Sequence, residues 1–287
     1  MNRIKKIIAP LLVLALLVAA LPAADASAAT KTQKDVLAAG ETMTYYSILG
    51  SVKSVKSTNK KVATAKKKNG KVVVKAKKKG KANIKIKTTF GTNIIKLTVK
   101  KKIKLAASIF ALSNGNIGVK IKNKSGFYLD TVNYTLSLKT SSGSVIETKK
   151  GYVYYLGAKK TGYDTISYYE SSNSVNHVDL SKCSIKYDSV NRGTALSYKF
   201  AKADKKVKFT NRKNSSKIAI TAKSTVKDSV YAGASVLFYD SMGNLIDVKD
   251  TTFYLSSKST STYEVSVPYN GYKSYKVVTR AYIKKIK

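Results

Sequence analysis

The fold of the first part of this chain is decided by residues 81–87, KANIKIK, and by residues 95–99, IKLTV. In both stretches apolar and polar residues alternate with a period of two, which places every second side chain on the same face of a β-strand. Residues 71–75, KVVVK, add a third strand signal, and the preceding Asn69-Gly70 accepts the positive φ angles of a tight hairpin turn. A disordered basic tail would not keep this period. The sequence therefore predicts a folded β-domain with aliphatic residues inside and lysines outside.

The length and composition of the chain favour several small β-domains. A chain of 287 residues suits two or three domains, and a hydrophobic content of 43% excludes wholesale disorder. The 20 tyrosines, together with many valines, isoleucines and threonines, are typical of strands. No stretch has the period of a long amphipathic helix. We therefore expect an all-β protein made of tandem β-sandwich domains.

The first 28 residues have the pattern of a signal peptide. Arg3, Lys5 and Lys6 form a positive segment, and residues 7–21 form an apolar one. Ala26-Ser27-Ala28 then supplies the small residues that a signal peptidase needs. The alternative, a transmembrane anchor, needs about 20 apolar residues, more than this run provides. We expect residues 1–28 to be removed, leaving an extracellular protein, secreted or loosely attached to the cell wall, with no transmembrane span.

Residues 30–102 carry a series of short motifs in a fixed order. The motifs are Ala39-Gly40-Glu41, Ser57-Thr58-Asn59, Val62-Ala63-Thr64, Asn69-Gly70-Lys71-Val72, residues 76–80, Lys81-Ala82-Asn83-Ile84 and Lys96-Leu97-Thr98-Val99. In this order they resemble the bacterial immunoglobulin-like domain of group 2. Val55 departs from that family, which often has Trp at this place. The resemblance implies an immunoglobulin-like β-sandwich over residues 30–102.

Two later blocks, residues 104–195 and 205–287, resemble each other at an offset of about 100 residues. The matching segments are residues 117–121 with 218–222, 132–138 with a strand that ends at 240, the turns at Gly143 and Gly243, and 154–156 with 253–255. Such self-similarity indicates a duplicated unit, and the number of short strands per copy indicates a small sandwich. Residues 236–240, VLFYD, are similar to the strand that marks the Phe-x-Leu-Tyr-Asp family of extracytoplasmic immunoglobulin-like domains. That resemblance implies a fold and no particular ligand, and we expect the three domains to follow one another as a semi-extended row.

The chain is poor in groups that catalyse reactions or bind metals. His177 is the only histidine and Cys183 the only cysteine, which excludes an internal disulfide and a zinc site of several His and Cys ligands. We expect His177 at the surface or half-buried, and Cys183 as a small buried side chain on the same strand face as Ile185. The densest carboxylates lack the alternate spacing of a calcium loop; they are Asp240, Asp247 and Asp250. The sequence predicts a protein that is not an enzyme and that has no cofactor and no metal site.

Positive charge is the strongest signal of function. The formal net charge is +39, and removal of residues 1–28 takes away three cations and one acid, which leaves +37. Only four of the 54 cations are arginines, so the pattern favours diffuse attraction to polyanions over bidentate recognition of one phosphate. Residues 31–104 contain 22 lysines and two acids. The predicted polyanion-binding lysines flank one hairpin and are expected to form a continuous patch: Lys66, Lys67, Lys68, Lys71, Lys77, Lys78, Lys79 and Lys81.

Tyrosine pairs give a second binding hypothesis. Each pair is expected to place one ring on either face of a strand; the pairs are Tyr45-Tyr46, Tyr154-Tyr155 and Tyr168-Tyr169. An outward ring either stacks on a sugar or supports its cross-strand neighbour, and both interpretations stay open.

Together these features predict a secreted or cell-envelope-associated adhesion or structural protein. Its expected partners are an anionic cell-wall polymer or acidic glycan and a protein at the cell surface, with nucleic acid bound only non-specifically. One alternative is a released cationic binding module for glycosaminoglycan or extracellular nucleic acid. Another is a hydrolase accessory protein. For the lysines themselves, the plain alternative is a solvated face that keeps the protein soluble.

Overall fold

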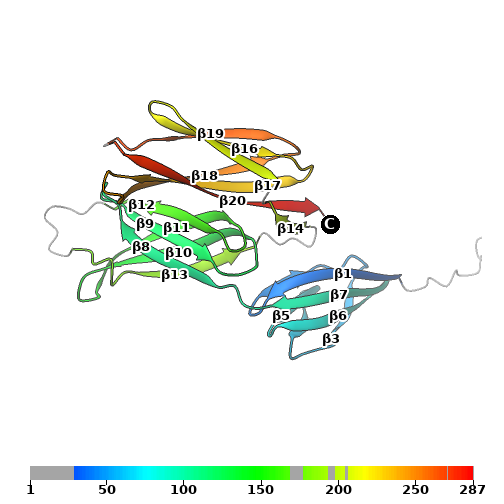
Figure 1. Ribbon diagram of the computed structural model, residues 1–287. Helices are drawn as coiled ribbons and strands as arrows, with labels where there is room; N and C mark the ends of the chain where they lie inside the picture. Colours follow the sequence, from blue (N-terminus) through cyan, green and yellow to red (C-terminus); the bar gives the residue numbers. More distant parts are fainter. Residues whose placement is uncertain (1–28, 169–176, 193–197, 204–205, 270, 287) are drawn as a thin grey trace, which may run out of the picture. The chain divides into compact units, whose positions relative to one another are not determined.

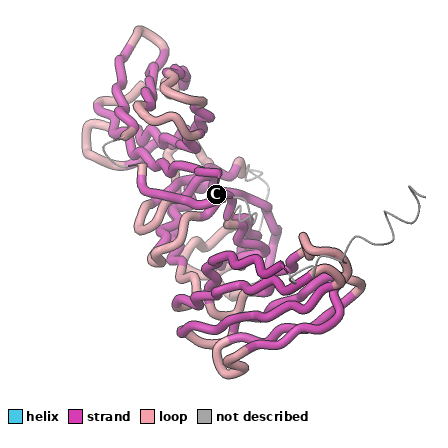
Figure 2. Tube along the Cα trace, turned by 90° about the vertical axis from the view of Figure 1, so that its right-hand side faces the viewer, coloured by secondary structure: helices cyan, strands magenta, loops and turns pink. Residues whose placement is uncertain are grey.

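All regular structure in the described part of the chain is β-strand, so the all-β prediction is confirmed (Figures 1 and 2). The computed structural model describes residues 29–168, 177–192, 198–203, 206–269 and 271–286. Within these ranges no helix has the length and apolar character needed to cross a membrane. The predicted signal peptide, residues 1–28, lies outside the described residues. The chain divides into two compact units, Met1–Lys101 and Lys102–Lys287, and each is taken by itself below.

The first unit is built from two sheets. One has the strand order β1-β7-β6-β3, with β1 and β7 parallel and the other pairs antiparallel, and the second has the order β2-β5-β4. The strands are β1 (Ala29–Ala38), β2 (Thr42–Tyr45), β3 (Val52–Ser57), β4 (Ala63–Lys68), β5 (Lys71–Ala76), β6 (Gly80–Thr88) and β7 (Gly91–Lys100).

The alternation in the sequence sets which side of each strand is buried. In β6, Ala82, Ile84 and Ile86 are buried while the residues between them are exposed, as the period of two predicts. Asn69 and Gly70 have φ angles of 47° and 71° in the turn between β4 and β5, which confirms the predicted hairpin. The strand signals of residues 71–75, 81–87 and 95–99 are therefore confirmed by β5, β6 and β7.

Tyr45 ties the two sheets of the first unit together. Its ring is buried, and its hydroxyl donates a 2.7 Å hydrogen bond to Oδ2 of Asp35 on β1. Val55 of β3 lies opposite Ile86 and is half-buried, so a small aliphatic side chain stands where the resembled family often has a tryptophan. The core between the sheets is mainly aliphatic with this one tyrosine, and three polar strand residues, Ser57, Thr88 and Asn93, are buried as well. The lysines of the strands are exposed.

The second unit contains two similar halves, each with two sheets. The first repeat has the sheets β12-β9-β8 and β11-β10-β13, and its strands are β8 (Leu105–Ala111), β9 (Ile117–Asn123), β10 (Leu129–Lys139), β11 (Val145–Leu156), β12 (Thr161–Ile166) and β13 (Ser184–Asn191). The second repeat has the sheets β15-β16-β19 and β14-β20-β17-β18, and its strands are β14 (Tyr198–Lys202), β15 (Val207–Lys213), β16 (Lys217–Ser224), β17 (Ser229–Tyr239), β18 (Leu245–Leu255), β19 (Thr260–Ser266) and β20 (Ser274–Ile286).

The two halves repeat each other in detail. Gly143 and Gly243 have φ angles of 87° and 82°, and their N–H groups donate to the carbonyls of Thr140 and Asp240, respectively. Three further features recur about 100 residues apart. The strand register shifts after Leu138 and after Phe238, and Lys159 and Lys258 both have positive φ angles. The side chains of Asn123 and Ser224 each accept a hydrogen bond from the N–H two residues further on. These shared hydrogen bonds and backbone conformations support the duplication inferred from the sequence.

The repeats pack face to face within the second unit, which differs from the expected row of separate domains. β17, β18 and β20 lie between β16 and β19 on one side and the strands of the first repeat on the other (Figure 1). Leu112 of the first repeat packs against Leu237 and Val248 of the second, and the Thr165 hydroxyl donates a 2.9 Å hydrogen bond to the Val248 carbonyl. The larger sheet of the second repeat is thus buried on both faces.

Candidate functional site

The outer face of the β2-β5-β4 sheet gathers four lysines. Strand register places Lys66 opposite Val73 and Lys68 opposite Lys71. Lys75 points to the same side as Lys71 because it is four residues, an even number, further along β5. The intervening Val72 and Val74 are buried in the core. We call the set Lys66, Lys68, Lys71 and Lys75 the lysine face.

A depression of about 530 Å³ lies on the lysine face. Hydroxyls of Thr42, Thr44 and Thr64 line it together with lysine side chains. Ammonium groups attract anionic oxygens as point charges, and hydroxyls donate to the same oxygens. The depression therefore has the chemistry to hold phosphate, sulfate or carboxylate groups of an extended polymer.

No carboxylate of the described chain neutralises the lysine face. Among the described residues, ion pairs do not involve any of its four lysines. Residues 29–101 contain 20 lysines and two acids, a net charge of +18. Both acids make hydrogen bonds within the fold: Asp35 accepts from the Tyr45 hydroxyl, and Glu41 accepts from the N–H of Ala38. The electrostatic field of this unit is strongly positive and attracts polyanions.

The other predicted lysines lie elsewhere on the first unit. Lys67 is exposed but opposes the inward-facing Val72. Residues 77–79 follow β5 at the end remote from the Asn69-Gly70 turn, and Lys81 is on the outer face of the other sheet, opposite Thr98. The structure brings Lys66, Lys68 and Lys71 together and separates the rest, so the expected continuous patch is divided. Lys75, which the sequence analysis did not select, joins the lysine face; its spacing of four from Lys71 was the signal.

A second cationic surface covers the outer face of the β1-β7-β6-β3 sheet. Lys85 on β6 lies directly opposite Lys56 on β3, and Lys96 on β7 lies opposite Lys34 on β1. Like charges facing each other across strands are destabilising unless counterions lie near them. Both sheets of this unit thus present lysines to the outside.

The tyrosine pair beside the lysine face behaves as predicted. Tyr45 is buried, whereas Tyr46 is 62% exposed, with Lys71 Nζ 4.9 Å from its ring centroid. The distance is within the range of a cation–π contact. Tyr46 therefore extends the lysine face with one aromatic ring.

The junction of the two repeats is organised around a buried arginine. Arg280 NH2 and NH1 donate to Asp250 Oδ2 and Oδ1 at 2.6 and 2.9 Å, and its Nε donates to the Tyr154 carbonyl at 2.7 Å. The NH1 group also donates to the Ser235 hydroxyl at 3.1 Å. A Cβ on Gly233 would lie 2.5 Å from Arg280 Cζ, so only glycine leaves room for the guanidinium. This network joins the repeats and was not anticipated from the sequence.

A cluster of tyrosines borders this ion pair. Tyr282 is buried and its hydroxyl hydrogen-bonds to Asp130 of the first repeat; burial and this carboxylate raise the pKa of Tyr282. Tyr155 has a φ of 52° and contacts the rings of Tyr154, Tyr231 and Tyr282. Because the Tyr154 and Tyr155 rings touch, the prediction that they take opposite faces is wrong: the left-handed residue interrupts the alternation. Tyr169 of the third pair lies outside the described residues.

Asp164 is a largely buried carboxylate near the same junction. Its Oδ2 accepts hydrogen bonds from the Tyr134 hydroxyl at 2.8 Å and the Tyr152 N–H at 2.9 Å, and its Oδ1 accepts from the Thr165 N–H. Burial raises the pKa of Asp164, and the hydrogen bonds only partly oppose this effect. The raised pKa of its buried carboxyl group distinguishes Asp164 from the exposed carboxylates of the chain.

The three aspartates of the densest carboxylate group have separate structural roles. Asp240 accepts hydrogen bonds from the Met242 and Asn244 N–H groups in the turn, Asp247 pairs with Lys249, and Asp250 holds Arg280. Within the described ranges, three or more His, Cys, Asp or Glu side chains are nowhere grouped as metal ligands would be. His177 is exposed, in agreement with its prediction.

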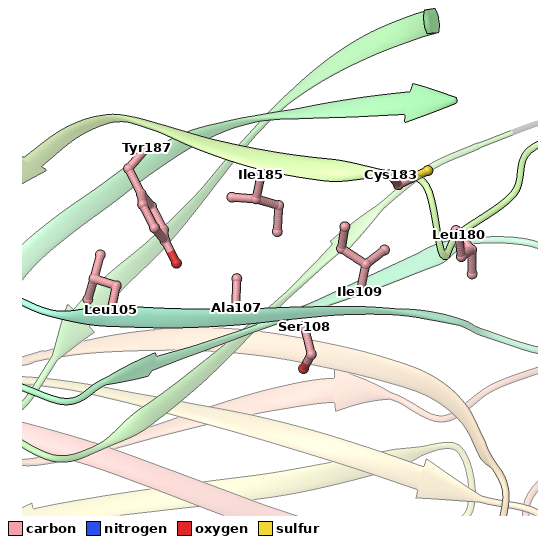
Figure 3. Close-up of a pocket in the computed structure, with 8 residues that line it drawn as sticks. All are labelled: Leu105, Ala107, Ser108, Ile109, Leu180, Cys183, Ile185 and Tyr187. Atoms are coloured by element: carbon pink, nitrogen blue, oxygen red, sulfur yellow. The ribbon is translucent and has the colours of Figure 1, made fainter. Parts of the chain in front are cut away.

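The first repeat has a hollow of about 440 Å³ between the edge strands β8 and β13 (Figure 3). Ile185 of β13 and Cys183, which comes just before that strand, both line the hollow, as their predicted shared face requires. Cys183 is half-buried rather than buried. Register matches Ala107 of β8 to Phe209 of β15, because they lie opposite Ile121 and Ala222. The hollow exists because the first repeat has Ala107 where the second has a phenylalanine.

A scan against protein-family models finds no match for this chain, and a search of curated proteins finds none either.

Proposed function

We propose that this chain is a secreted or cell-envelope-associated adhesion or structural protein that binds anionic surface polymers through the lysine face. The domains would be immunoglobulin-like, with a group-2 domain over residues 30–102 and the repeats related to the Phe-x-Leu-Tyr-Asp family. Paired sheets around aliphatic cores support this assignment, as do the motifs of the first unit. The partner would be a wall polymer or acidic glycan outside the cell.

The observation that carries the proposal is a threonine-lined depression that Lys66, Lys68 and Lys75 line. Lys71 lies beside it, opposite Lys68. A solvated face serving solubility needs neither a depression nor convergent hydroxyls, because dispersed charge of either sign is enough. Strands rise about 3.4 Å per residue, so Lys66 and Lys68 on β4 are about 7 Å apart and Lys71 and Lys75 on β5 are about 14 Å apart. These spacings suit repeated charges along a flexible polymer more than one compact ion.

Binding is favoured over catalysis by what surrounds the carboxylates. Asp164, Asp240 and Asp250 each have hydrogen-bond partners within the fold, and the depression on the lysine face is lined by lysines, threonines and small apolar residues. General acid–base chemistry needs a titratable group within reach of the substrate, with a pKa near the working pH. A binding module is therefore the function that the geometry supports best.

The test is co-sedimentation of the purified mature chain with Gram-positive cell walls. The proposal predicts that the chain pellets with walls at about 0.05 M NaCl and is released at about 0.5 M. Walls stripped of anionic polymer by acid should no longer pellet it. Binding to heparin or DNA that far exceeds wall binding at about 0.15 M salt would favour the released cationic module instead. Retention on stripped walls would contradict the lysine-face mechanism.

A further inference from the structure

A groove of about 730 Å³ lies where the two repeats meet in the second unit. Its lining from the first repeat includes Tyr152, Tyr154 and Asp164, and its lining from the second includes Asp250 and Tyr263. We call it the junction groove. Its volume is within the range of sites that bind small molecules, which combine aromatic walls with a few placed polar groups.

The tyrosine rings of the junction groove are exposed and held in place. Tyr152, Tyr154 and Tyr263 are 54%, 37% and 49% exposed. The first two rings contact each other with centroids 4.9 Å apart, and the ring of Tyr263 packs edge-on against Phe253 at 5.3 Å. Exposed aromatic rings fixed by neighbours bind flat apolar surfaces at little entropic cost, because their rotamers are already restricted.

Hydrogen bonds between the repeats hold the walls of the groove in register. The Arg280 Nε donates to the carbonyl of Tyr154, and the Thr165 hydroxyl donates to the carbonyl of Val248. The Tyr152 N–H donates to Asp164, which fixes the strand that carries the first ring. The site is therefore preformed rather than assembled by the ligand.

The polar groups of the groove are suited to a neutral ligand rich in hydroxyls. Asp164 and Asp250 offer carboxylate oxygens as acceptors, and the hydroxyls of Thr251 and Thr252 both donate and accept. Arg280 is paired with Asp250, and Lys249, which also lines the groove, is paired with Asp247. Because each cation at the groove has a carboxylate partner, the groove lacks the uncompensated positive charge of the lysine face. A proline-rich peptide offers mainly carbonyl acceptors, which match these carboxylates less well than sugar hydroxyls do.

We propose that the junction groove binds a neutral oligosaccharide, with sugar rings stacked on Tyr152, Tyr154 and Tyr263 and hydroxyls donating to the carboxylates. Two binding sites of different chemistry would then lie on one chain: a salt-sensitive site for polyanions on the first unit and a salt-insensitive site for neutral glycan on the second. The inference goes beyond the proposed function and does not depend on it.

The test uses the full mature chain and two neutral probes, a β-1,4-linked glucose hexamer and a β-1,4-linked N-acetylglucosamine hexamer. Calorimetric titration should show binding of at least one hexamer, unchanged between about 0.05 and 0.5 M NaCl. Tyr152→Ala and Tyr263→Ala should each weaken it about tenfold or more, with the melting temperature retained. Tyr269→Ala is the matched control, because Tyr269 is fully exposed and does not line the groove.

Failure of both hexamers to bind at about 10 mM would overturn the inference, and so would unchanged affinity in both tyrosine variants. Binding of a proline-rich peptide in place of the hexamers would overturn it in favour of a peptide site. The result is separable from the lysine-face test. A chain with Lys66, Lys68, Lys71 and Lys75 changed to Gln should lose wall binding and keep hexamer binding.

Discussion

The Arg280 network offers the sharpest test of how the repeats are joined. We predict that Arg280→Leu destabilises the second unit. The substitution removes three charge-assisted or neutral hydrogen bonds to side chains and one to the Tyr154 carbonyl, and it leaves the carboxylate of Asp250 without its partner. Breaking a buried ion pair by removing one member costs about 3–5 kcal/mol. Because the Asp250 side chain is 24% exposed while Arg280 is not exposed, water can partly rehydrate the carboxylate, and we expect about 3 kcal/mol.

Urea unfolding followed by tyrosine fluorescence measures this loss directly. Residues 102–287 hold 18 of the 20 tyrosines, so the signal reports mainly on the second unit. The double variant Arg280→Leu with Asp250→Leu should recover most of the loss, since replacing both partners by apolar residues is often neutral. Lys217→Ala, which breaks an exposed 2.8 Å ion pair with Glu264, is the control and should leave the transition in place. A loss below about 1 kcal/mol in Arg280→Leu would refute the idea that the buried Arg280 network stabilises the second unit.

Three further outcomes follow from the same structure. Ala107→Phe should fill the hollow of the first repeat with the side chain that the second repeat has at Phe209. We expect the unfolding free energy to rise by about 1 kcal/mol and the modification of the Cys183 thiol by a maleimide to slow. A destabilised variant with an equally reactive thiol would contradict the assignment of that hollow. The unfolding free energy of the second unit should fall as pH rises from the ordinary Asp164 pKa of 3.8 through its raised folded-state pKa, because the folded chain holds a proton that the unfolded chain releases. Asp164→Asn should remove that slope, while Asp179→Asn, at an exposed carboxylate whose pKa is lowered, should keep it. Added salt should raise the melting temperature of the first unit by about 5 °C between about 0.05 and 0.5 M NaCl, since screening relieves the repulsion of its lysines; a flat or falling curve would mean that these charges are already compensated within the fold.

The strands of the first unit could be predicted because each has one face in the core and the other in solvent. In β6 the period of two separates Ile84 and Ile86 from Lys85 and Lys87, so sequence alone gives the faces. The hairpin turn at Asn69-Gly70 could also be predicted from the sequence, because few residue pairs accept its positive φ angles. The duplication could be inferred from turns that recur about 100 residues apart.

The packing of the repeats could not be predicted from hydropathy alone, because polar side chains contribute to it beside the apolar contact of Leu112 with Leu237 and Val248. Arg280 and Tyr282 have the composition of a solvated strand face, yet both are buried. One signal was present: residues 230–238 of β17 form an almost unbroken run of apolar and small residues, including Gly233, and such runs are typical of strands buried on both faces. The lysine face was only partly predicted because grouping by sequence proximity ignores two effects. Alternation separates Lys67 from Lys66 and Lys68, and strand pairing places Lys81 in the other sheet.

The salt dependence of wall binding by a neutralised lysine face tests the central claim most directly. The variant carries Lys66→Gln, Lys68→Gln, Lys71→Gln and Lys75→Gln, and its matched control carries the same change at four exposed lysines of the repeats, Lys120, Lys122, Lys208 and Lys223. Each contact with a flexible polyanion contributes about 0.7 units to the slope of log affinity against log salt, so loss of four lysines should remove about 3 units of slope from the variant and less than about 1 from the control. Equal losses in the two proteins would mean that net charge alone, and not the face formed by β4 and β5, holds the chain to the polymer.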